Sequence, residues 1–313
     1  MKVLVTGGAG FIGSHIVDGM LEAGYEVVVI DNLSTGKEEN IAPQAKFYNL
    51  NLQDAELEDI FKEERPDYVD HHAAQASVAV SVKDPILDAE SNILGSINLL
   101  ENCVRYGVKK IIFASSGGCV YGEADELPTT EEAPFKAPPS PYGITKITGE
   151  YYFQFYQDKK GLNCTVLRYA NIYGPRQDPY GEAGVVAIFT QAMLDGRTPL
   201  IYAAKQPGDG GCIRDYTYVG DVVRANLLAL EKGDNEAFNI GSGIGTKTEE
   251  LFKMMSQIIG YTKAPKQLPP RPGDILRSTL SSAKAKRVLG WKPEVTLEEG
   301  LRRTIEYLKD SMR

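Results

Sequence analysis

The 313-residue sequence is poor in cysteine, has no excess of basic charge and lacks a long apolar stretch. Its four cysteines form no CxxC pair and have no zinc-ligand spacing, so we expect neither a disulfide framework nor a metal site. The N-terminus has no basic leader, and no segment is apolar for long enough to cross a membrane. We therefore expect reduced thiols, no membrane span and a cytoplasmic protein.

The charge balance argues against a nucleic-acid partner. The chain carries 42 acidic and 34 basic side chains, a net charge of -8. Binding to a nucleic-acid backbone needs a basic face, which this composition disfavours. A few converging arginines or lysines would still bind a small anionic ligand.

Predicted strands and helices alternate over the first half of the chain. Strands are predicted at 46–49 and 68–71, and helices at 55–63, 88–106 and 143–158. The continuous apolar run Val27–Ile30 is typical of a parallel strand buried on both faces. This order predicts an α/β fold with a Rossmann-type doubly wound parallel sheet. Asp70 is unusual, because it places a carboxylate in a predicted buried strand.

A glycine-rich turn separates the first predicted strand from the first predicted helix. The segment 6–13 reads TGGAGFIG and satisfies both GxGxxG and GxxGxxG. Glycines at Gly7, Gly10 and Gly13 let the backbone approach a pyrophosphate at the N-terminus of the following helix. Because the pattern lies between a predicted strand and a predicted helix, it indicates a dinucleotide-binding turn more specifically than the glycine spacing would by itself.

Asp31 ends the second predicted strand, about 20 residues after the turn. A carboxylate there accepts a hydrogen bond from a ribose 2′-hydroxyl and repels a 2′-phosphate. No arginine follows within residues 32–36. We therefore predict NAD rather than NADP as the cofactor.

The second half of the chain is less regular. Loops rich in Pro and Gly are predicted at 175–184 and 203–211, whereas the helix at 220–231 and the strand at 237–240 return to the sheet. We predict an NAD-binding Rossmann domain at 1–169 plus 215–242. A smaller C-terminal α/β domain at 170–214 plus 243–313 would bind the substrate.

Tyr142 and Lys146 form a YxxxK pair at the start of a predicted helix. The spacing of four residues places both side chains on one helix face. A tyrosine has a pKa of about 10, and lowering it to near 7 requires about 4 kcal/mol of stabilisation. A neighbouring ammonium and a bound nicotinamide cation can supply that stabilisation, so Tyr142 is a candidate general base.

The ordered motifs resemble those of the extended short-chain dehydrogenase/reductase family, NAD-dependent epimerases and dehydratases of nucleotide sugars. The resemblance covers nearly the whole chain. It rests on the following motifs: TGGAGFIG at 6–13, DN at 31–32, HHAAQASV at 71–78, NxxGxxNLL at 92–100, SSGGCVYGE at 115–123, PYGITK at 141–146, RYANIYGPRQ at 168–177, CIRDYTYVGDV at 212–222, RPGD at 271–274 and LGWKP at 289–293.

The resemblance implies roles for individual residues. Tyr142 and Lys146 would be catalytic, with Ser116 or Cys119 as candidates for a third group. NAD would contact Gly7, Gly10, Phe11, Ile12, Gly13, Asp31, Asn32, Ser34, Gly36, Asn51, Leu52, Ala73, Ala74, Asn92, Ser115, Tyr142, Lys146 and Tyr169. The substrate, a UDP-sugar, would contact Val78, Asn171, Val186, Phe189, Arg214, Arg271 and Asp274.

Some of these roles have plain alternatives. Arginine suits a diphosphate because it is a bidentate donor. Arg214 or Arg271 taken alone is more typical of a solvated surface charge, and it is the flanking motifs that favour the binding role. Val186 and Phe189 would line a base pocket or simply fill a helix core.

Gly117 departs from the family pattern. The family has Ser or Thr at this position, three residues before the Val of VYG. Ser116, Cys119 or a water molecule would have to supply the missing hydroxyl. Cys119 could lie near the sugar or be a small buried apolar side chain.

The same segment favours 4-epimerisation over dehydration. The resembling 4,6-dehydratases carry Asp-Glu where this chain has Gly118 and Cys119. Removal of water from the sugar needs an acid and a base at that point, and a 4-epimerase needs neither. We therefore predict a UDP-hexose 4-epimerase acting through a 4-keto intermediate. The alternatives are a dehydratase, a C5-type epimerase or an NAD-binding protein that has lost catalysis.

Two further expectations follow from the resemblance. The helices at 92–106 and 143–158 would form a homodimer interface, unless both only pack on the sheet. The small side chain of Ser278, four residues after Asp274, suggests that N-acetylated hexoses are accepted as well as plain ones.

Overall fold

The structure, a computed structural model, describes residues 1–180, 184–271 and 273–311. Its main feature is a parallel sheet in the order β10-β6-β5-β4-β1-β2-β3. The predicted Rossmann-type fold class is confirmed. The strands are β1 Lys2–Thr6, β2 Glu26–Asp31, β3 Lys46–Asn49, β4 Tyr68–His71, β5 Lys110–Ser116, β6 Cys164–Tyr169 and β10 Ala237–Ile240.

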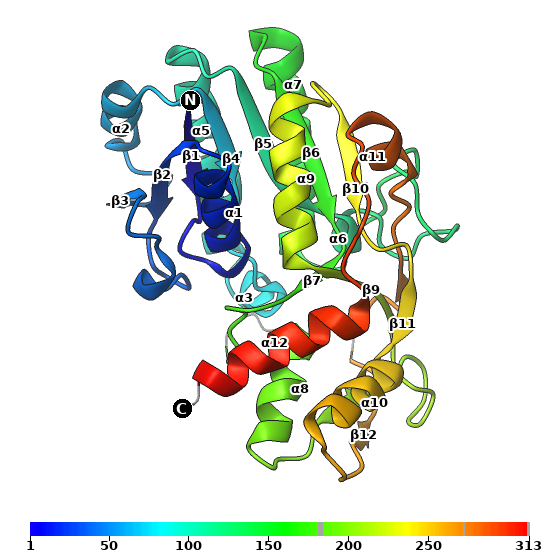
Figure 1. The fold of residues 1–313 in the computed structure, drawn as a ribbon. Helices are drawn as coiled ribbons and strands as arrows, with labels where there is room; N and C mark the ends of the chain where they lie inside the picture. Colours follow the sequence, from blue (N-terminus) through cyan, green and yellow to red (C-terminus); the bar gives the residue numbers. More distant parts are fainter. Residues whose placement is uncertain (181–183, 272, 312–313) are drawn as a thin grey trace.

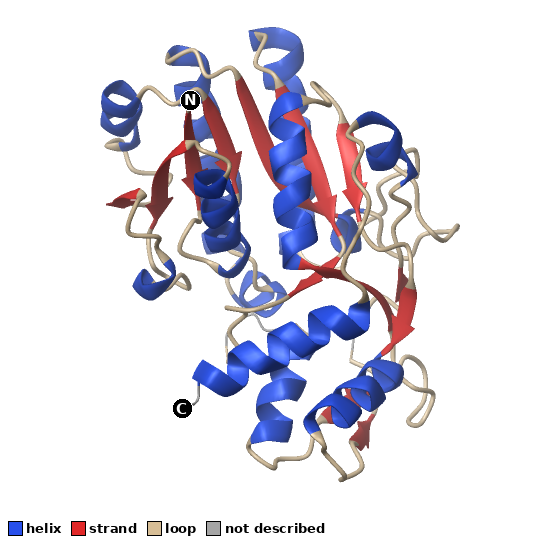
Figure 2. Cartoon of the chain, viewed as in Figure 1, coloured by secondary structure: helices blue, strands red, loops and turns tan. Residues whose placement is uncertain are grey.

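Helices cover both faces of this sheet, as Figures 1 and 2 show. One face packs against α1 (Phe11–Glu22), α9 (Val219–Glu231) and, beside β10, α11 (Ala283–Val288). The other packs against α2 (Leu57–Glu64), α5 (Gly95–Arg105) and α7 (Pro141–Lys160). Successive residues of β2 belong to opposite cores, Val28 to one and Val29 to the other. This two-sided burial explains the continuous apolar run in the sequence.

The helix predicted at 88–106 is present over nearly its whole length, but it begins earlier, at Pro85, and contains a π-turn that was not predicted. Asp84 caps a short α4 (Pro85–Ala89), accepting a hydrogen bond from the backbone N–H of Leu87. A π-helical turn, η2 (Glu90–Leu94), then leads into α5. π-Turns are common at functional sites because they re-aim one side chain without ending the helix. The short helix α3 (Val78–Lys83) precedes α4 and packs against it, and a 3-10 turn, η1 (Glu38–Asn40), lies between β2 and β3.

The C-terminal part joins a small mixed sheet to a helical layer below the main sheet. Its strands are β7 Asn171–Tyr173, β9 Ile213–Tyr218, β11 Gly245–Lys247 and β13 Arg277–Ser278, with β8 Leu200–Tyr202 paired to β12 Lys266–Leu268. Its helices are α8 Val185–Leu194, α10 Thr248–Ile259 and α12 Leu297–Ser311. Phe189, Phe252 and Leu301 meet in the core between these helices.

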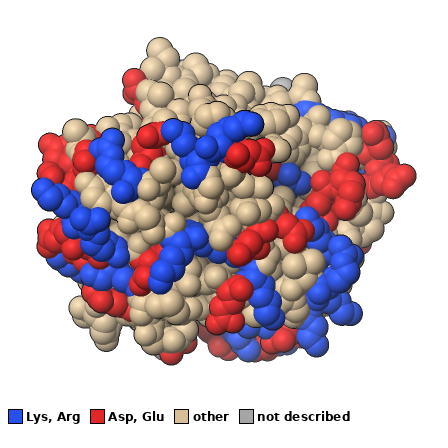
Figure 3. Space-filling model, turned by 90° about the horizontal axis from the view of Figure 1, so that it is seen from above, with Lys and Arg blue, Asp and Glu red and all other residues tan. Residues whose placement is uncertain are grey.

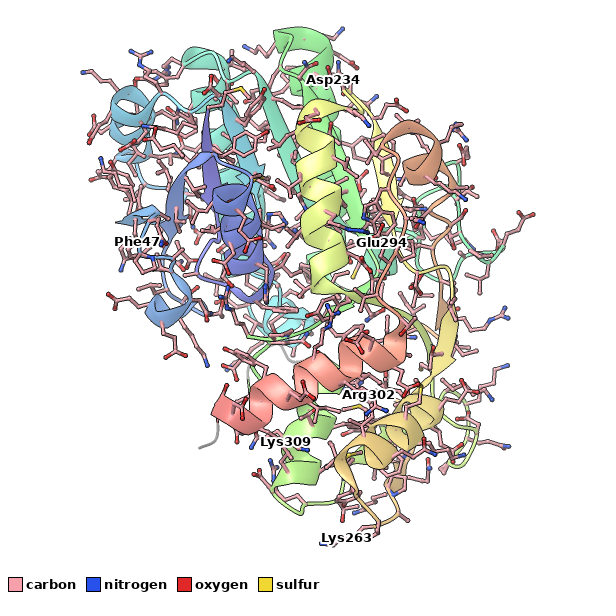
Figure 4. The ribbon with its side chains drawn as sticks, in the orientation of Figure 1. Phe47, Asp234, Lys263, Glu294, Arg302 and Lys309 are labelled. Carbon is pink, nitrogen blue, oxygen red and sulfur yellow. The ribbon has the colours of Figure 1, made fainter. Side chains whose placement is uncertain are left out.

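The two ends of the sheet differ in what covers them. Asp234 marks the amino end of β10 at the top of Figure 4, whereas Arg302 and Lys309 lie on α12, beyond the carboxyl ends. From the top, acidic and basic side chains intermingle over the face that Figure 3 shows. The carboxyl ends, where ligands bind in open parallel sheets, instead face the C-terminal part. Among the described residues, no helix is long and apolar enough to span a bilayer.

Candidate active site

A cleft of about 1540 Å³ lies between the carboxyl ends of the main sheet and the C-terminal part. Apart from Asn92 and Cys119, every residue predicted to be catalytic, cofactor-binding or substrate-binding lines this cleft. Residues more than 200 positions apart in the sequence therefore converge on one site.

The glycine turn forms a tight cradle at one end of the cleft. Gly7 has a φ of 71°, and its N–H donates to the carbonyl oxygen of Ile30 at 2.7 Å. A Cβ on Gly13 would lie 2.1 Å from the carbonyl oxygen of Gly7, so only glycine fits there. Helix α1 starts after Gly10 with no side-chain cap and no acidic residue in its first turn. Its first N–H groups are thus open to an anion in the cleft.

Asp31 is fixed beside this cradle. One carboxylate oxygen accepts from the N–H of Ala9 at 3.0 Å, and the other from the N–H of Leu33 at 2.8 Å. The side chain is buried, and residues 34 and 36 line the cleft next to it. A carboxylate held by two backbone donors retains lone pairs for a ribose hydroxyl.

Asn32 and Asn51 close the same end of the cleft. The amide nitrogen of Asn32 donates to the side-chain oxygen of Asn51 at 2.9 Å. Asn51 is in turn held by Asp54, which accepts from its backbone N–H and its side-chain amide. Leu52 follows as a buried side chain on the cleft wall.

Tyr142 and Lys146 lie in the first turns of α7. Pro141 starts this helix, and Ser140 caps it by accepting from the N–H of Gly143 at 3.3 Å. The Lys146 ammonium donates to the carbonyl oxygen of Ala114 at 2.8 Å and lies 5.7 Å from the Tyr142 ring centre. Burial lowers the pKa of Lys146 to about 8. The spacing of four residues thus delivers a buried ammonium beside a phenol, as predicted.

The end of β5 and the turn after it distinguish the two side chains, Ser116 and Cys119, that are candidates for the missing hydroxyl. Ser116 lines the cleft with Tyr142 and Lys146, whereas Gly117 and Cys119 do not. A Cβ on Gly117 would meet Leu280, with 2.5 Å to its Cδ1. Position 117 therefore faces the core beside the short helix α6 (Gly117–Val120), and the serine one residue earlier faces the cleft. Ser115, the residue before Ser116, donates to Glu150 of α7 at 2.5 Å.

Asn92 lies behind the wall of the cleft. Its side-chain oxygen accepts from the N–H of Gln75 at 2.8 Å, and its amide donates to the carbonyl oxygen of Gln75 at 2.9 Å. Asp88 accepts from Gln75 and Asn92 through one oxygen and from Thr145 through the other. The π-turn that aims Asn92 thus ties the loop 72–77 of the cleft wall to the catalytic helix.

The opposite end of the cleft carries the two predicted arginines. The Arg271 guanidinium stacks 4.3 Å from the Tyr202 ring centre and donates to Asp274 at 3.1 Å. Arg214 lies on β9 and donates to the carbonyl oxygen of Ile213 at 3.0 Å. Both line the cleft, which distinguishes them from ordinary surface charges.

Apolar residues complete that end. Val186 and Phe189 are buried in the core of the C-terminal part and also contribute to the cleft wall. Val78 begins α3 across the cleft, after Ser77, whose hydroxyl accepts from the N–H of Val80 at 2.9 Å. Asn171 stands on β7, just beyond the end of β6.

Several cleft residues were not predicted. Those with polar or chemically reactive side chains include His72, Gln75, Arg176, Gln177, Arg197, Tyr202 and Cys212. His72, Gln75, Arg176, Gln177 and Cys212 lie inside quoted motifs, so the motif letters could have identified them. Arg197 and Tyr202 lie outside every quoted motif, and the sequence around them gave no signal for the site. No cluster of three or more His, Cys, Asp or Glu suited to a metal occurs in the described part of the chain.

Comparison with known proteins places this cleft among related ones. The sequence matches the NAD dependent epimerase/dehydratase family over residues 3–241. The crystal structure of the UDP-glucose 4-epimerase of Thermotoga maritima with UDP-glucose is 56% identical, with a TM-score of 0.96 and 100% of both chains covered. That of the Thermus thermophilus UDP-glucose 4-epimerase in complex with NAD is 50% identical, with a TM-score of 0.94 and 99% of both chains covered. The UDP-glucose 4-epimerase of Mycolicibacterium smegmatis is 43% identical over 99% of both chains.

Proposed function

We propose a function for this chain from one premise: it belongs to the NAD dependent epimerase/dehydratase family. It is an NAD-dependent UDP-glucose 4-epimerase, which interconverts UDP-glucose and UDP-galactose. The observation that carries this proposal is the single cleft that joins the glycine cradle, the Tyr142–Lys146 pair and two arginines. Relatives that bind NAD and UDP-glucose support it.

The cradle fits a dinucleotide. The 2.1 Å approach that a Cβ on Gly13 would make to Gly7 shows a turn tight enough to bring backbone N–H groups to a pyrophosphate. Asp31 is placed to accept from a ribose 2′-hydroxyl and to exclude a 2′-phosphate. When bound, NAD supplies a reversible hydride acceptor. The cleft volume of about 1540 Å³ exceeds the roughly 300–1,000 Å³ of a pocket for one ligand, so cofactor and substrate fit together.

The two parts of the chain would bind different ligands. Residues 1–169 and 215–242 would hold NAD, and residues 170–214 and 243–313 would hold the nucleotide sugar. Arg214 and Arg271 reach the cleft from the second group of residues, where their charges would neutralise the diphosphate.

Tyr142 would remove the proton from the sugar 4-hydroxyl and return it on the opposite face. The ammonium of Lys146, held by the carbonyl oxygen of Ala114, stabilises the phenolate form of this tyrosine. The 4-keto sugar then turns about its diphosphate link, which the arginines keep in place, and presents its other face to the same groups.

Ser116 would replace the hydroxyl that the family pattern lacks at Gly117. It lines the cleft with Tyr142, so its hydroxyl can donate to the sugar 4-oxygen. Cys119 remains near enough to Lys146 to affect its charge, but it is not part of the cleft wall.

The segment after β5 favours epimerisation over dehydration. Gly118 and Cys119 stand where the resembling dehydratases carry Asp-Glu, and Gly118 has no side chain to act as an acid. Tyr142 and Lys146 are both present and paired in the cleft, which argues against an inactive NAD-binding protein.

The decisive experiment replaces Tyr142 by Phe. UDP-galactose is supplied, and UDP-glucose formation is followed by chromatography, with product mass recorded because epimerisation leaves it unchanged. Tyr142→Phe should lower kcat by about 10²–10⁴-fold while NAD stays bound. Tyr307→Phe, at an exposed position on α12 outside the cleft, is the control. Full activity of Tyr142→Phe, or loss of water from the product, would refute the proposal.

The chain would work as a cytoplasmic homodimer. Exposed apolar side chains gather on α3, α4 and α7, which pack together, and include Val82, Ile86, Tyr151 and Phe155. Such a patch is typical of a protein interface. None of the four cysteines forms a disulfide, which suits a reducing compartment. Sedimentation should give twice the chain mass, and Phe155→Glu should give the chain mass; a monomeric parent protein would contradict the dimer.

N-acetylated substrates would also be accepted. Ser278 is small and pairs in register with Arg214, the residue proposed to hold the diphosphate. Turnover of UDP-N-acetylglucosamine tests this directly, and a failure to convert it under conditions that convert UDP-glucose would contradict the proposal.

A further inference from the structure

Glu150 is a buried carboxylate on the helix that carries the proposed base. Tyr142, Lys146 and Glu150 follow one another at a spacing of four residues along α7, so they lie on one face of that helix. The first two side chains line the cleft, whereas Glu150 lies outside it, in the core between α7 and the main sheet.

Arg168 of β6 supplies the opposite charge. Its Nε donates to both carboxylate oxygens of Glu150, at 3.0 and 3.1 Å, and its Nη2 donates to Oε2 at 2.6 Å. Its Nη1 donates to the Tyr121 hydroxyl at 2.6 Å, and the guanidinium lies 4.8 Å from the Phe135 ring centre. Both charged side chains are buried. Several charge-assisted hydrogen bonds of this kind fix a buried ion pair in one geometry.

Ser115 joins strand β5 to this ion pair. Its hydroxyl donates to Oε1 of Glu150 at 2.5 Å, and it lies opposite Arg168 in register between β5 and β6. The next pair in register is Ser116 and Tyr169, and both of these residues line the cleft. The three hydrogen-bonded side chains therefore meet one residue behind the floor of the cleft.

Strand β5 and helix α7 are thus connected at two successive positions. Lys146 donates to the carbonyl oxygen of Ala114 at 2.8 Å. Glu150, one turn further along α7, accepts from Ser115, the next residue of β5. These contacts oppose both a slide of α7 along β5 and a rotation of α7 about its axis, because either movement would break at least one of them.

We propose that Glu150 and Arg168 are positioning residues for the reaction. They hold α7 against β5, so that Tyr142 and Lys146 keep a fixed place relative to Ser116. The inference rests on the proposed function, because it concerns the groups assigned there to the sugar 4-hydroxyl. Neither Glu150 nor Arg168 lines the cleft, so the pair acts on the reaction through α7 and β5 and not through contact with a ligand.

Glu150 also acts on Lys146 through its charge. The titratable groups around Lys146 come from β4, α4, α6 and α7; they are His71, Asp88, Cys119, Tyr142 and Glu150. Burial lowers the pKa of Lys146 to about 8, and Glu150 opposes that lowering, as do Asp88 and Cys119. Burial also lowers the pKa of His71, so this imidazole is neutral near pH 7. Without Glu150 the pKa of Lys146 should fall further, and the alkaline decline of kcat/KM should begin at lower pH.

The test replaces both partners at once, by Glu150→Met combined with Arg168→Met. The double variant leaves no buried charge unpaired, which is why it should fold. Turnover of UDP-galactose is measured against pH, and bound NAD is quantified after acid denaturation. A misplacement of about 1 Å costs about 10²-fold in rate, so kcat should fall by about that factor. The KM for UDP-galactose and the content of bound NAD should stay as in the parent protein, and the alkaline decline should move to lower pH.

Lys110→Met is the matched control. Lys110 is a buried residue of the same strand β5, and its ammonium pairs with Asp234 at 2.6 Å at the amino end of the sheet, at the top of Figure 4. Loss of this pair should lower the melting temperature and leave kcat and its pH profile unchanged.

Glu150→Asp is the second variant, and it gives the same measurement if the double variant does not fold. It keeps both charges in the core but shortens the carboxylate side chain by one methylene, so that α7 or Ser115 must move to restore the contacts. It should lower kcat and leave the alkaline decline at the pH of the parent protein, because the charge next to Lys146 is retained.

Two results would overturn the inference: parental kcat in the folded variants of Glu150 and Arg168, or an equal loss of kcat in Lys110→Met. A parent protein that does not convert UDP-galactose would instead overturn the proposed function. Parental turnover in both the parent and the double variant leaves the proposed function standing and removes only the positioning role.

Discussion

We predict that placing a hydroxyl at position 117 instead of 116, by Gly117→Ser, destabilises the folded protein. The family pattern suggests that Gly117→Ser would restore a missing catalytic group. The geometry predicts the opposite, because a Cβ there would lie 2.5 Å and 2.9 Å from the two methyl carbons of Leu280. Leu280 is buried with Val120 and Tyr121, so it has little room to move.

The magnitudes follow from these contacts. Overpacking of this kind lowers the free energy of unfolding by about 1–3 kcal/mol, and the melting temperature by several degrees. Ser116→Ala removes a hydroxyl from the cleft wall without filling or emptying the core. It should lower kcat by about 10²-fold, as loss of one donor to a developing charge does, while leaving stability within about 0.5 kcal/mol.

The assay pairs urea unfolding with turnover of UDP-galactose. Gly118→Ala is the matched control for stability, because its nearest contact would be 3.9 Å away, at the Ser116 hydroxyl. We expect Gly117→Ser to lose stability and Gly118→Ala to keep it. A Gly117→Ser variant as stable as the parent, or one that rescues the activity of Ser116→Ala, would refute the assignment of the hydroxyl to Ser116.

Three further predictions follow from the site. The pKa of Lys146 is about 8 in the folded chain and about 10.5 for an exposed lysine, so the unfolded chain binds more protons than the folded chain between these two pH values. The free energy of unfolding in urea should therefore rise with pH through that window. Over the same window kcat/KM should fall, because Lys146 loses the positive charge beside Tyr142. Arg214→Ala should weaken UDP binding about 10–100-fold by calorimetry, with kcat at saturation little changed. Thr145→Val removes the donor to one oxygen of Asp88 and should lower the free energy of unfolding by about 1–3 kcal/mol, measured by urea titration.

The main sheet was predictable because its signals are local. Strands β3, β4 and β10 have the bounds that the sequence predicts, Lys46–Asn49, Tyr68–His71 and Ala237–Ile240. Strands β4 and β10 are mostly buried, whereas β3 is a partly exposed edge strand. The signal that the three share is the alternation of short strands with helices along the chain. The glycine turn and the YxxxK pair are equally local, because their spacing alone determines which atoms come together.

Other features depend on residues far away in the chain. The π-turn at Asn92 is stabilised by Gln75 and Thr145, and no window around residue 92 contains either. Asp70 makes sense only through His72 and its contact with Tyr169 from β6. The exclusion of side chains at Gly117 comes from Leu280, more than 160 residues later. Motifs identify such positions without giving the physical reason for them.

The connection between the main sheet and the C-terminal sheet suits a substrate whose sugar must rotate during the reaction. The chain leaves the main sheet at Tyr169 and enters the C-terminal sheet at Asn171, and the N–H of Ala170 between them donates to Ile240 of β10 at 3.0 Å. Asn171 pairs in register with Tyr216 of β9, the strand that carries Arg214. The floor of the cofactor site and the proposed diphosphate anchor are therefore connected by one pair of hydrogen-bonded strands. A diphosphate held on that pairing keeps a fixed relation to Tyr142, so rotation about the diphosphate link brings either face of the sugar to the same phenol.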